Sequence, residues 1–258
     1  ADHLIVESTY GNRRHRDRQA TIDEMGEIIS EAAHHRGNLL IPAFSIGRTQ
    51  ELLYYFGTYY EEWGLDRWHV FLDSPMAIRA SKVYWEYPHL YDEEATKLRR
   101  RIHEMPHLQN LRLTPTPEES MAINRIKSGA IIISASGMCT GGRILHHLKH
   151  NITRSGAHVM IVGFQAPGTL GRALVDRKPT VRIHGDEYRV NARVHTVGGL
   201  SAHADVDDLG HWVGQFENNP RVHVVHGDEE PKQAFRQYLA ESLGLSADIP
   251  EPGELLEL

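Results

Sequence analysis

Residues 130–143 read AIIISASGMCTGGR, an apolar run of strand length followed by a glycine-rich loop. The consecutive isoleucines at 131–133 are typical of a strand buried on both faces, because branched side chains fit a pleated surface and leave no polar face. The stretch at 143–150 is predicted to be a helix. Strand, loop and helix together form the repeating unit of an α/β fold.

The same alternation extends on both sides of this stretch. A short strand at 4–6 opens the chain. Further strands are predicted at 38–43, 69–72, 111–113, 130–134 and 158–162, and helices at 20–33, 46–63, 76–87, 118–126 and 143–150. Short apolar strands that alternate with helices indicate an α/β fold with a doubly wound, mostly parallel sheet, since parallel strands need crossover connections.

The pattern changes near residue 180. Apolar stretches at 181–183 and 188–196 flank Gly185-Asp186-Glu187, which predicts an antiparallel pair. A helix after 201–205 that ends at about residue 216, a strand at 222–225 and a helix at 229–243 follow. We therefore expect the last part of the chain to belong to a different layer from the first 180 residues.

Composition excludes several classes of protein. The chain has 258 residues, enough for one or two domains with a sizeable core. No apolar run approaches the roughly 18 residues of a membrane helix, and no signal peptide opens the chain, so no membrane partner is expected. A net charge of −6 excludes a globally basic nucleic-acid binder, and any anion site must be a local patch. The single cysteine, Cys139, excludes an intramolecular disulfide and favours a cytoplasmic location.

The loop at 134–143 is a candidate anion cradle. Backbone N–H groups and a helix N-terminus converge where a glycine-rich loop joins a strand to a helix. Ser136, Gly137 and Arg143 are the candidate phosphate contacts. The glycine spacing resembles a P-loop, but Arg143-Ile144 replaces the Lys-Ser/Thr pair, so an NTPase is rejected. A tight βα turn without a ligand remains the alternative.

Arg48 lies at a second junction between a strand and a helix. Ser45 is predicted to cap that helix, and Arg48 falls in its first turn. A cation is unfavourable there, because the helix dipole favours acids in the first turn. Arg48 is therefore expected to face a carboxylate or a phosphate, and both readings stay open.

Three chemically capable residues stand at strand ends. Glu7 follows the strand at 4–6, His226 follows the strand at 222–225, and His203 lies in the loop GLSAHAD. Side chains at such ends project into the cleft where α/β proteins keep their chemistry. A carboxylate can orient an imidazole and make it a general acid. The groups His34–His35, His146–His147 and His223 with His226 lack a complete ligand set and are predicted to be structural.

The motifs together resemble the β-CASP branch of the metallo-β-lactamase superfamily, a family of RNA-processing nucleases. The matching strings are LIVESTYG (4–11), PAFSIGRTQELL (42–53), LDSPMA (72–77), SASGMCTGGR (134–143), GFQAPGTLGR (163–172), GLSAHAD (199–205) and VVHGDEE (224–230). The resemblance implies that residues 12–195 form the β-CASP domain. Residues 1–11 and 196–258 would then be parts of a metallo-β-lactamase αββα domain.

The resemblance also implies roles for single residues. Glu7 and His203 match the catalytic pair, with His203 as general acid and Glu7 orienting it. His226 matches a zinc ligand of a site that holds two Zn²⁺ in the complete enzyme. The loop at Ser136 and Gly137 would line the RNA groove, with Arg48, Arg143 and Ser201 as further RNA contacts.

One departure separates this sequence from the family. The family's H-x-H-x-D-H zinc motif precedes the strand at 4–6, and no H-x-H occurs anywhere in the chain. We expect a fragment whose parent is a zinc-dependent ribonuclease, and which alone is metal-poor and inactive because one imidazole cannot hold zinc. Its expected partners are RNA and the missing N-terminal segment, and a homodimer stays open. A noncatalytic RNA-binding or scaffolding subunit is the alternative, and a nucleotide-binding α/β protein fits the topology but not the motifs.

Overall fold

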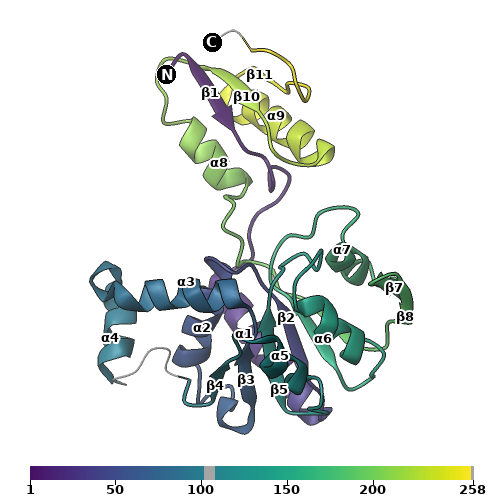
Figure 1. The fold of residues 1–258 in the computed structure, drawn as a ribbon. Coiled ribbons are helices and arrows are strands. Elements are labelled where there is room, and N and C mark those ends of the chain that lie inside the picture. Colours follow the sequence, from purple (N-terminus) through teal and green to yellow (C-terminus); the bar gives the residue numbers. More distant parts are fainter. Residues whose placement is uncertain (102–107, 257–258) are drawn as a thin grey trace. The chain divides into compact units, whose positions relative to one another are not determined.

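The computed structural model describes residues 1–101 and 108–256, and the chain forms two compact units. Ala1–Arg16 together with Ser201–Leu258 form the first, called the small unit below. Asp17–Leu200 form the second, the large unit. Figure 1 shows that the first and last segments of the chain share the small unit, with β1 beside β10.

The large unit is built on one six-stranded sheet whose paired strands are all parallel. Its order is β4 (Leu111–Leu113), β3 (His69–Leu72), β5 (Ala130–Ser134), β2 (Leu39–Pro42), β6 (His158–Ile161) and β9 (Arg193–Thr196). Every residue of β2, β5 and β6 is buried. This burial explains the continuous apolar runs in the sequence, because both faces of these strands are covered.

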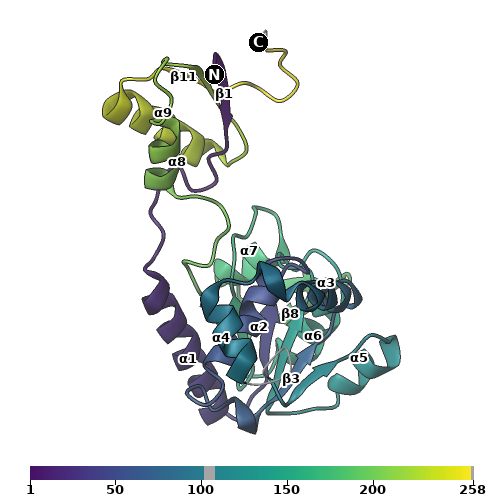
Figure 2. The same cartoon turned by 90° about the vertical axis from the view of Figure 1, so that its left-hand side faces the viewer.

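Helices cover the two faces of this sheet, as two views show (Figures 1 and 2). They are α1 (Arg18–His34), α2 (Arg48–Thr58), α3 (Pro75–Glu86), α5 (Pro117–Ile123), α6 (Ile144–Asn151) and α7 (Leu170–Val175), and α4 (Glu93–Arg101) follows α3 in the chain. Leu39 and Ile41 of β2 belong to a core with α1 and α2, whereas Leu40 belongs to a second core with α6. The alternation confirms the predicted doubly wound α/β class.

The region after residue 180 differs from the prediction. β7 (Thr180–Ile183) and β8 (Asp186–Arg189) form the expected antiparallel pair, but the single strand predicted at 188–196 is wrong. Asn191 and Ala192 turn the chain away, because both of their backbone N–H groups donate to the carbonyl oxygen of Ile152. The chain then continues as β9, which pairs in parallel with β6.

Two further differences concern helix ends and short elements. The helix predicted at 46–63 is shorter, since α2 covers Arg48–Thr58 and a 3-10 turn follows at Leu65–Arg67. α4, α7, the 3-10 turn Pro88–Leu90 and β11 (Ala247–Asp248) were not predicted.

The small unit has a three-stranded parallel sheet and two helices. β10 (Arg221–Val224) lies between β1 (His3–Val6) and β11. Leu4 and Val6 belong to one buried cluster with residues of α8 (Val206–Val213) and α9 (Glu229–Leu243). Ile5 points to the opposite face and is 54% exposed. The helices therefore cover the face of β1 that carries Leu4 and Val6, and Ile5 on the other face remains open.

Within the described ranges, no helix combines the length and the apolar character that crossing a membrane requires.

Candidate active site

Glu7 and His226 leave the same edge of the small sheet. β1 and β10 are parallel with Val6 opposite Val224, so the residues that follow both strands meet at their carboxyl ends. The Val225 N–H donates to the Val6 carbonyl at 2.8 Å, and the Ser8 N–H donates to the His226 carbonyl at 3.0 Å. These bonds hold the two turns together and fix the backbone that carries both side chains.

Gly227 permits this close approach. A Cβ at this position would lie 2.7 Å from Ser8 Oγ and 3.0 Å from the Ser8 carbonyl carbon. His226 itself has φ of +47°, a left-handed conformation that non-glycine residues rarely adopt.

Glu7 and His203 form an acid–imidazole pair. Glu7 Oε1 lies 3.2 Å from His203 Nδ1, and the Thr9 N–H donates to Glu7 Oε2 at 2.7 Å. A carboxylate oxygen accepts hydrogen bonds, so this contact favours the His203 tautomer with its proton on Nδ1. The side chains are 26% and 40% exposed, so a substrate can reach the pair.

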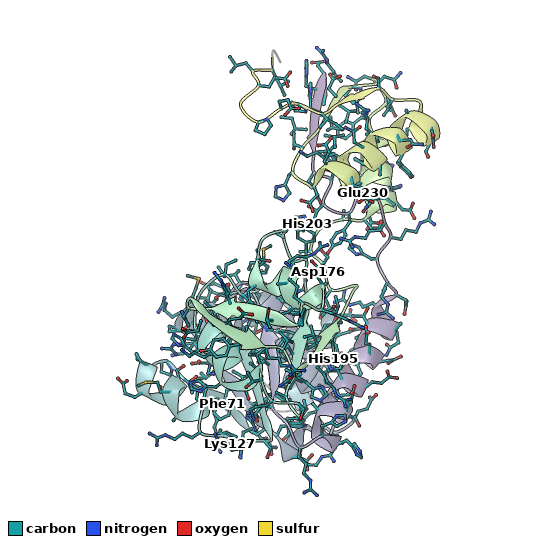
Figure 3. The ribbon with its side chains drawn as sticks, turned by 90° about the vertical axis from the view of Figure 1, so that its right-hand side faces the viewer. Phe71, Lys127, Asp176, His195, His203 and Glu230 are labelled. Carbon is teal, nitrogen blue, oxygen red and sulfur yellow. The ribbon has the colours of Figure 1, made fainter. Side chains whose placement is uncertain are left out.

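His203 also stacks on His226. Their ring centroids are 5.6 Å apart with an interplanar angle of 25°. Figure 3 labels His203 at the end of the small unit's sheet. The Ser201 hydroxyl accepts from the His203 N–H at 3.2 Å and so shapes the loop that carries the imidazole.

Two residues that the sequence analysis left without a role hold this loop. Asp205 caps α8 by accepting from the N–H groups of Asp207 and Asp208, and it also accepts from the His15 N–H at 2.9 Å. Burial alone would raise the pKa of Asp205, but these backbone donors outweigh it and lower the pKa. His15 Nε2 in turn lies 2.7 Å from the His203 carbonyl oxygen. An acidic N-cap followed by two aspartates is a recognisable helix start, whereas nothing in the sequence pairs residue 15 with residue 203.

Among the residues that the structure describes, His226 belongs to no group of three metal-capable side chains. Across residues 1–101 and 108–256, one group of three metal-capable side chains has its ligand atoms within 4.8 Å of one another, and His226 is not in it. Structural zinc takes four ligands and catalytic zinc takes three plus water. The residues present around His226 therefore do not fit zinc without further ligands.

In the large unit, two backbone N–H groups of the predicted anion-cradle loop already have a hydrogen-bond acceptor within the loop. Ser136 Oγ accepts from the N–H groups of Thr140 and Gly141 at 3.0 and 3.3 Å. A Cβ on Gly137 would lie 2.9 Å from the Phe44 ring, so tight packing alone explains this glycine. The loop thus has the properties of a tight βα turn, and phosphate binding by Ser136 and Gly137 stays a prediction.

Arg143 belongs to a buried network around Asp73. Its guanidinium donates to Asp73 Oδ1 at 2.8 Å and to the carbonyl oxygens of Thr114 and Pro115, and its side chain is 18% exposed. His147 Nε2 lies 2.6 Å from Asp73 Oδ2. The structure therefore gives Arg143 a structural role, and its contact with RNA stays a prediction.

The Asp73 carboxylate is fully buried and has four side-chain partners. Besides Arg143 and His147, the hydroxyls of Thr114 and Ser120 donate to it at 2.8 and 2.6 Å. Burial opposes ionisation, but the hydrogen bonds from His147, Ser120 and Thr114 outweigh it and lower the pKa of Asp73. The sequence motif LDSPMA thus marks a structural anchor.

Arg48 faces a carboxylate, one of the two partners expected for it. Its guanidinium pairs with Glu51 one turn along α2, and the Arg48 side chain is 10% exposed. The cap predicted at Ser45 is wrong, because the N-cap of α2 is Gly47, with φ of +79° and no side-chain hydrogen bond. Ser45 Oγ instead lies 3.2 Å from Ser74 Oγ.

Two family models match the chain. Residues 49–174 match the Beta-Casp domain, and residues 187–250 match the Zn-dependent metallo-hydrolase RNA specificity domain. The chain belongs to the β-CASP family. The resemblance inferred from the motifs is thereby confirmed, and zinc dependence is a property of this family.

Named relatives are similar over most of the chain. Ribonuclease TTHA0252 of Thermus thermophilus is 39% identical over 242 residues, which are 93% of this chain and 54% of the relative. Probable RNase MJ4 of Methanocaldococcus jannaschii is 30% identical over 260 residues, 100% of this chain and 56% of the relative. Transcription termination factor FttA of the same organism is 31% identical over 239 residues, 88% of this chain and 37% of the relative. This β-CASP chain thus spans about half the length of the two RNase relatives. It spans a smaller share, 37%, of the termination factor.

The predicted site residues of this β-CASP chain are divided between its units. Glu7, Ser201, His203 and His226 lie in the small unit, and Arg48, Ser136, Gly137 and Arg143 lie in the large unit. The small unit brings its four residues to one sheet edge and its adjoining loop. In the large unit, the charged groups of both arginines are already paired with carboxylates.

Proposed function

We propose that this chain is the β-CASP and C-terminal portion of a zinc-dependent ribonuclease that hydrolyses RNA phosphodiester bonds. The observation that carries the proposal is the Glu7–His203 pair, with Nδ1 of His203 3.2 Å from the carboxylate, stacked beside His226. The match to an RNA specificity domain and the ribonuclease names of two relatives support RNA as the substrate. The predicted domain division, 1–11, 12–195 and 196–258, is part of the proposal.

His203 supplies the proton for the leaving oxygen. Hydrolysis forms a bond between the oxygen of water and phosphorus and breaks the bond between phosphorus and the leaving oxygen, which needs a proton. With Nδ1 held by Glu7, protonated His203 presents Nε2–H to that oxygen. Glu7 stabilises the imidazolium and keeps the ring in one orientation, so it acts as a positioning residue.

His226 is proposed as one ligand of a two-zinc site whose other ligands lie in a preceding H-x-H-x-D-H segment. Zinc supplies Lewis-acid chemistry there when it is bound. Two observations support such a segment as a partner: no described residues complete a ligand set with His226, and Ile5, on the face of β1 opposite α8 and α9, is 54% exposed. The chain alone is therefore proposed to be metal-poor at His226 and inactive.

The remaining assignments rest on the motifs. Ser136, Gly137, Arg48, Arg143 and Ser201 are proposed RNA contacts, and with a net charge of −6 any RNA-binding surface is a local patch. A cytoplasmic location is proposed from the single cysteine. Burial raises the pKa of Cys139 to about 12, so it stays a neutral thiol.

Two variants of the intact protein, with its zinc-binding segment, test the proposal. His203→Ala is expected to slow cleavage of a labelled RNA by about 10²–10⁴-fold while zinc content stays nearly unchanged, because His203 is a proton donor. His226→Ala is expected to lose zinc as well as cleavage. His211→Ala serves as the matched control, since His211 is an exposed histidine of the same unit.

Three outcomes would contradict the assignments. Loss of zinc in His203→Ala would make His203 a ligand, and unchanged zinc in His226→Ala would remove that residue from the metal site. An intact wild-type protein that binds RNA and zinc but cleaves nothing would support the noncatalytic alternative.

A further inference from the structure

Three metal-capable side chains of the large unit meet at the end of α1. Glu31 lies in the last turn of α1, His35 is its C-cap residue, and His158 is the first residue of β6. One ligand atom of each lies within 4.8 Å of the others. Residues four apart share one face of a helix, so Glu31 and His35 both face β6. From the sequence, His35 is predicted to be structural together with His34, because its companion ligand His158 comes from a distant strand.

Two buried ring nitrogens in this group have no hydrogen-bond partner among the described residues. His158 is fully buried, and among the described residues neither His158 Nε2 nor His35 Nδ1 has a hydrogen-bond partner. A buried polar atom without a partner costs free energy, so two such atoms beside a carboxylate call for an explanation, and a bound ion supplies one. A cation that is coordinated by the lone pairs of both nitrogens gives each of them a partner.

The other nitrogen of His158 is already oriented. His158 Nδ1 lies 2.8 Å from Nε2 of His195 on β9, and the two rings are stacked with an interplanar angle of 4°. Figure 3 labels His195 in the large unit. When Nδ1–H of His158 donates to His195, Nε2 is left as a lone pair. Histidines that bind metals use this arrangement, since the second ring nitrogen donates to a fixed acceptor.

Glu31 retains capacity for a cation. Arg193 donates to Glu31 Oε1, and His35 Nδ1 lies 3.9 Å from the same oxygen. A carboxylate offers two oxygens and about four lone-pair sites, so the Arg193 contact leaves room for another partner. Glu31 and His35 are only partly buried, with side chains 38% and 27% exposed, which gives a cation and one water access from solvent.

We propose that Glu31, His35 and His158 bind one divalent cation of the zinc class, which ties the end of α1 to β6. Two imidazoles and a carboxylate form a zinc ligand set in which water takes the fourth position. Calcium and magnesium are disfavoured, because they prefer oxygen ligands. The cation stabilises the large unit, since it joins two elements that are far apart in the sequence.

Metal binding to the 258-residue chain tests the proposal without any activity assay. Chelator-treated protein is titrated with ZnCl₂ by calorimetry and with CoCl₂, whose absorption reports imidazole coordination. Glu31→Gln and His35→Gln are the decisive variants, because both side chains are partly exposed and their loss leaves the core intact. Exposed Glu27→Gln and His34→Gln are the matched controls on the same helix.

Wild type and both controls are expected to bind one Zn²⁺ per chain. His195→Asn is expected to weaken binding by roughly 10–100-fold, because it removes only the group that orients His158. Glu31→Gln and His35→Gln are expected to weaken it by more than that, and zinc is expected to raise the melting temperature of wild type but not of these two. Absence of stoichiometric zinc in wild type, or unchanged binding in both decisive variants, would overturn the proposal. His226→Ala leaves this site unchanged, so the result stands apart from the proposed ribonuclease function.

Discussion

Asp73 with His147 and Glu7 with His203 are two acid–histidine pairs with opposite properties. Both acids directly follow the end of a parallel strand, β3 or β1. Asp73 and His147 are fully buried at 2.6 Å, whereas Glu7 and His203 are 26% and 40% exposed at 3.2 Å. An acid that follows a parallel strand and pairs with a histidine can therefore lie in the core or at the surface, and burial distinguishes the two pairs.

The hydrogen-bond partners make the distinction sharper. His147 uses both ring nitrogens, Nε2 towards Asp73 and Nδ1 towards Asn124 Oδ1 at 2.9 Å. His203 Nδ1 lies 3.2 Å from Glu7 Oε1, and its side chain is 40% exposed. A buried histidine with both nitrogens engaged stabilises the fold, while a partly exposed one can exchange a proton with a substrate.

The largest expected effect on stability is that of Asp73→Ala. This change leaves Arg143 and His147 buried without their shared carboxylate, and removal of one partner from a buried pair costs about 3–5 kcal/mol. Urea unfolding followed by the fluorescence of buried Trp63 and Trp68 measures the loss. Glu7→Ala is the comparison, and we expect it to change stability by about 1 kcal/mol or less. Equal losses of unfolding free energy in Asp73→Ala and Glu7→Ala would contradict the distinction between a buried structural pair and an exposed pair.

Acid should destabilise the large unit through the same carboxylate. The pKa of Asp73 is lowered in the folded chain, so the unfolded chain takes up its proton at a higher pH. The stability contributed by Asp73 is therefore complete above the unfolded pKa of about 3.9 and is lost as the pH falls through the lower folded pKa. Asp73→Asn should weaken this acid dependence, measured as the urea midpoint between about pH 3 and 7. An unchanged slope in that variant would assign the acid sensitivity to other groups.

A smaller effect is expected at the turn that carries His226. Gly227→Ala places a Cβ 2.7 Å from Ser8 Oγ and 3.0 Å from Ser8 backbone atoms, and overpacking of this kind costs about 1–3 kcal/mol. Gly163→Ala is the control, because nothing lies within 4 Å of its Cβ. Equal unfolding midpoints for both variants would show that the turn has room to relax.

Elements with strong local patterns could be predicted from the sequence. β3, β4, β5 and α9 begin and end as predicted, and β5 does so because its consecutive isoleucines are a clear strand signal. The prediction of one strand at 188–196 is wrong because the chain turns at Asn191 and Ala192. Their N–H groups donate to the carbonyl oxygen of Ile152, a residue that is distant in the sequence. β11 is two residues long and has no pattern of its own.

The same distinction holds for the candidate site: residues with a local sequence signal were predicted, and contacts between distant segments were not. Glu7 and His226 follow strands, so topology alone indicates them. The partners of Arg143 arrive from β3 and from residues 114–115, and only the folded sheet reveals that its charge is already used. The group Glu31, His35 and His158 was missed for the same reason, because a helix end and a distant strand supply its members.

The central claim is that His203 donates a proton to the leaving oxygen. The direct test compares wild type with His203→Ala, in the intact zinc-loaded protein, on RNA that carries either oxygen or sulfur at the leaving position. A thiolate leaves without a proton, so only the oxygen substrate needs the imidazole. His203→Ala is expected to cleave the oxygen substrate about 10²–10⁴-fold more slowly and the sulfur substrate at nearly the wild-type rate. An equal loss on both substrates would contradict the claim.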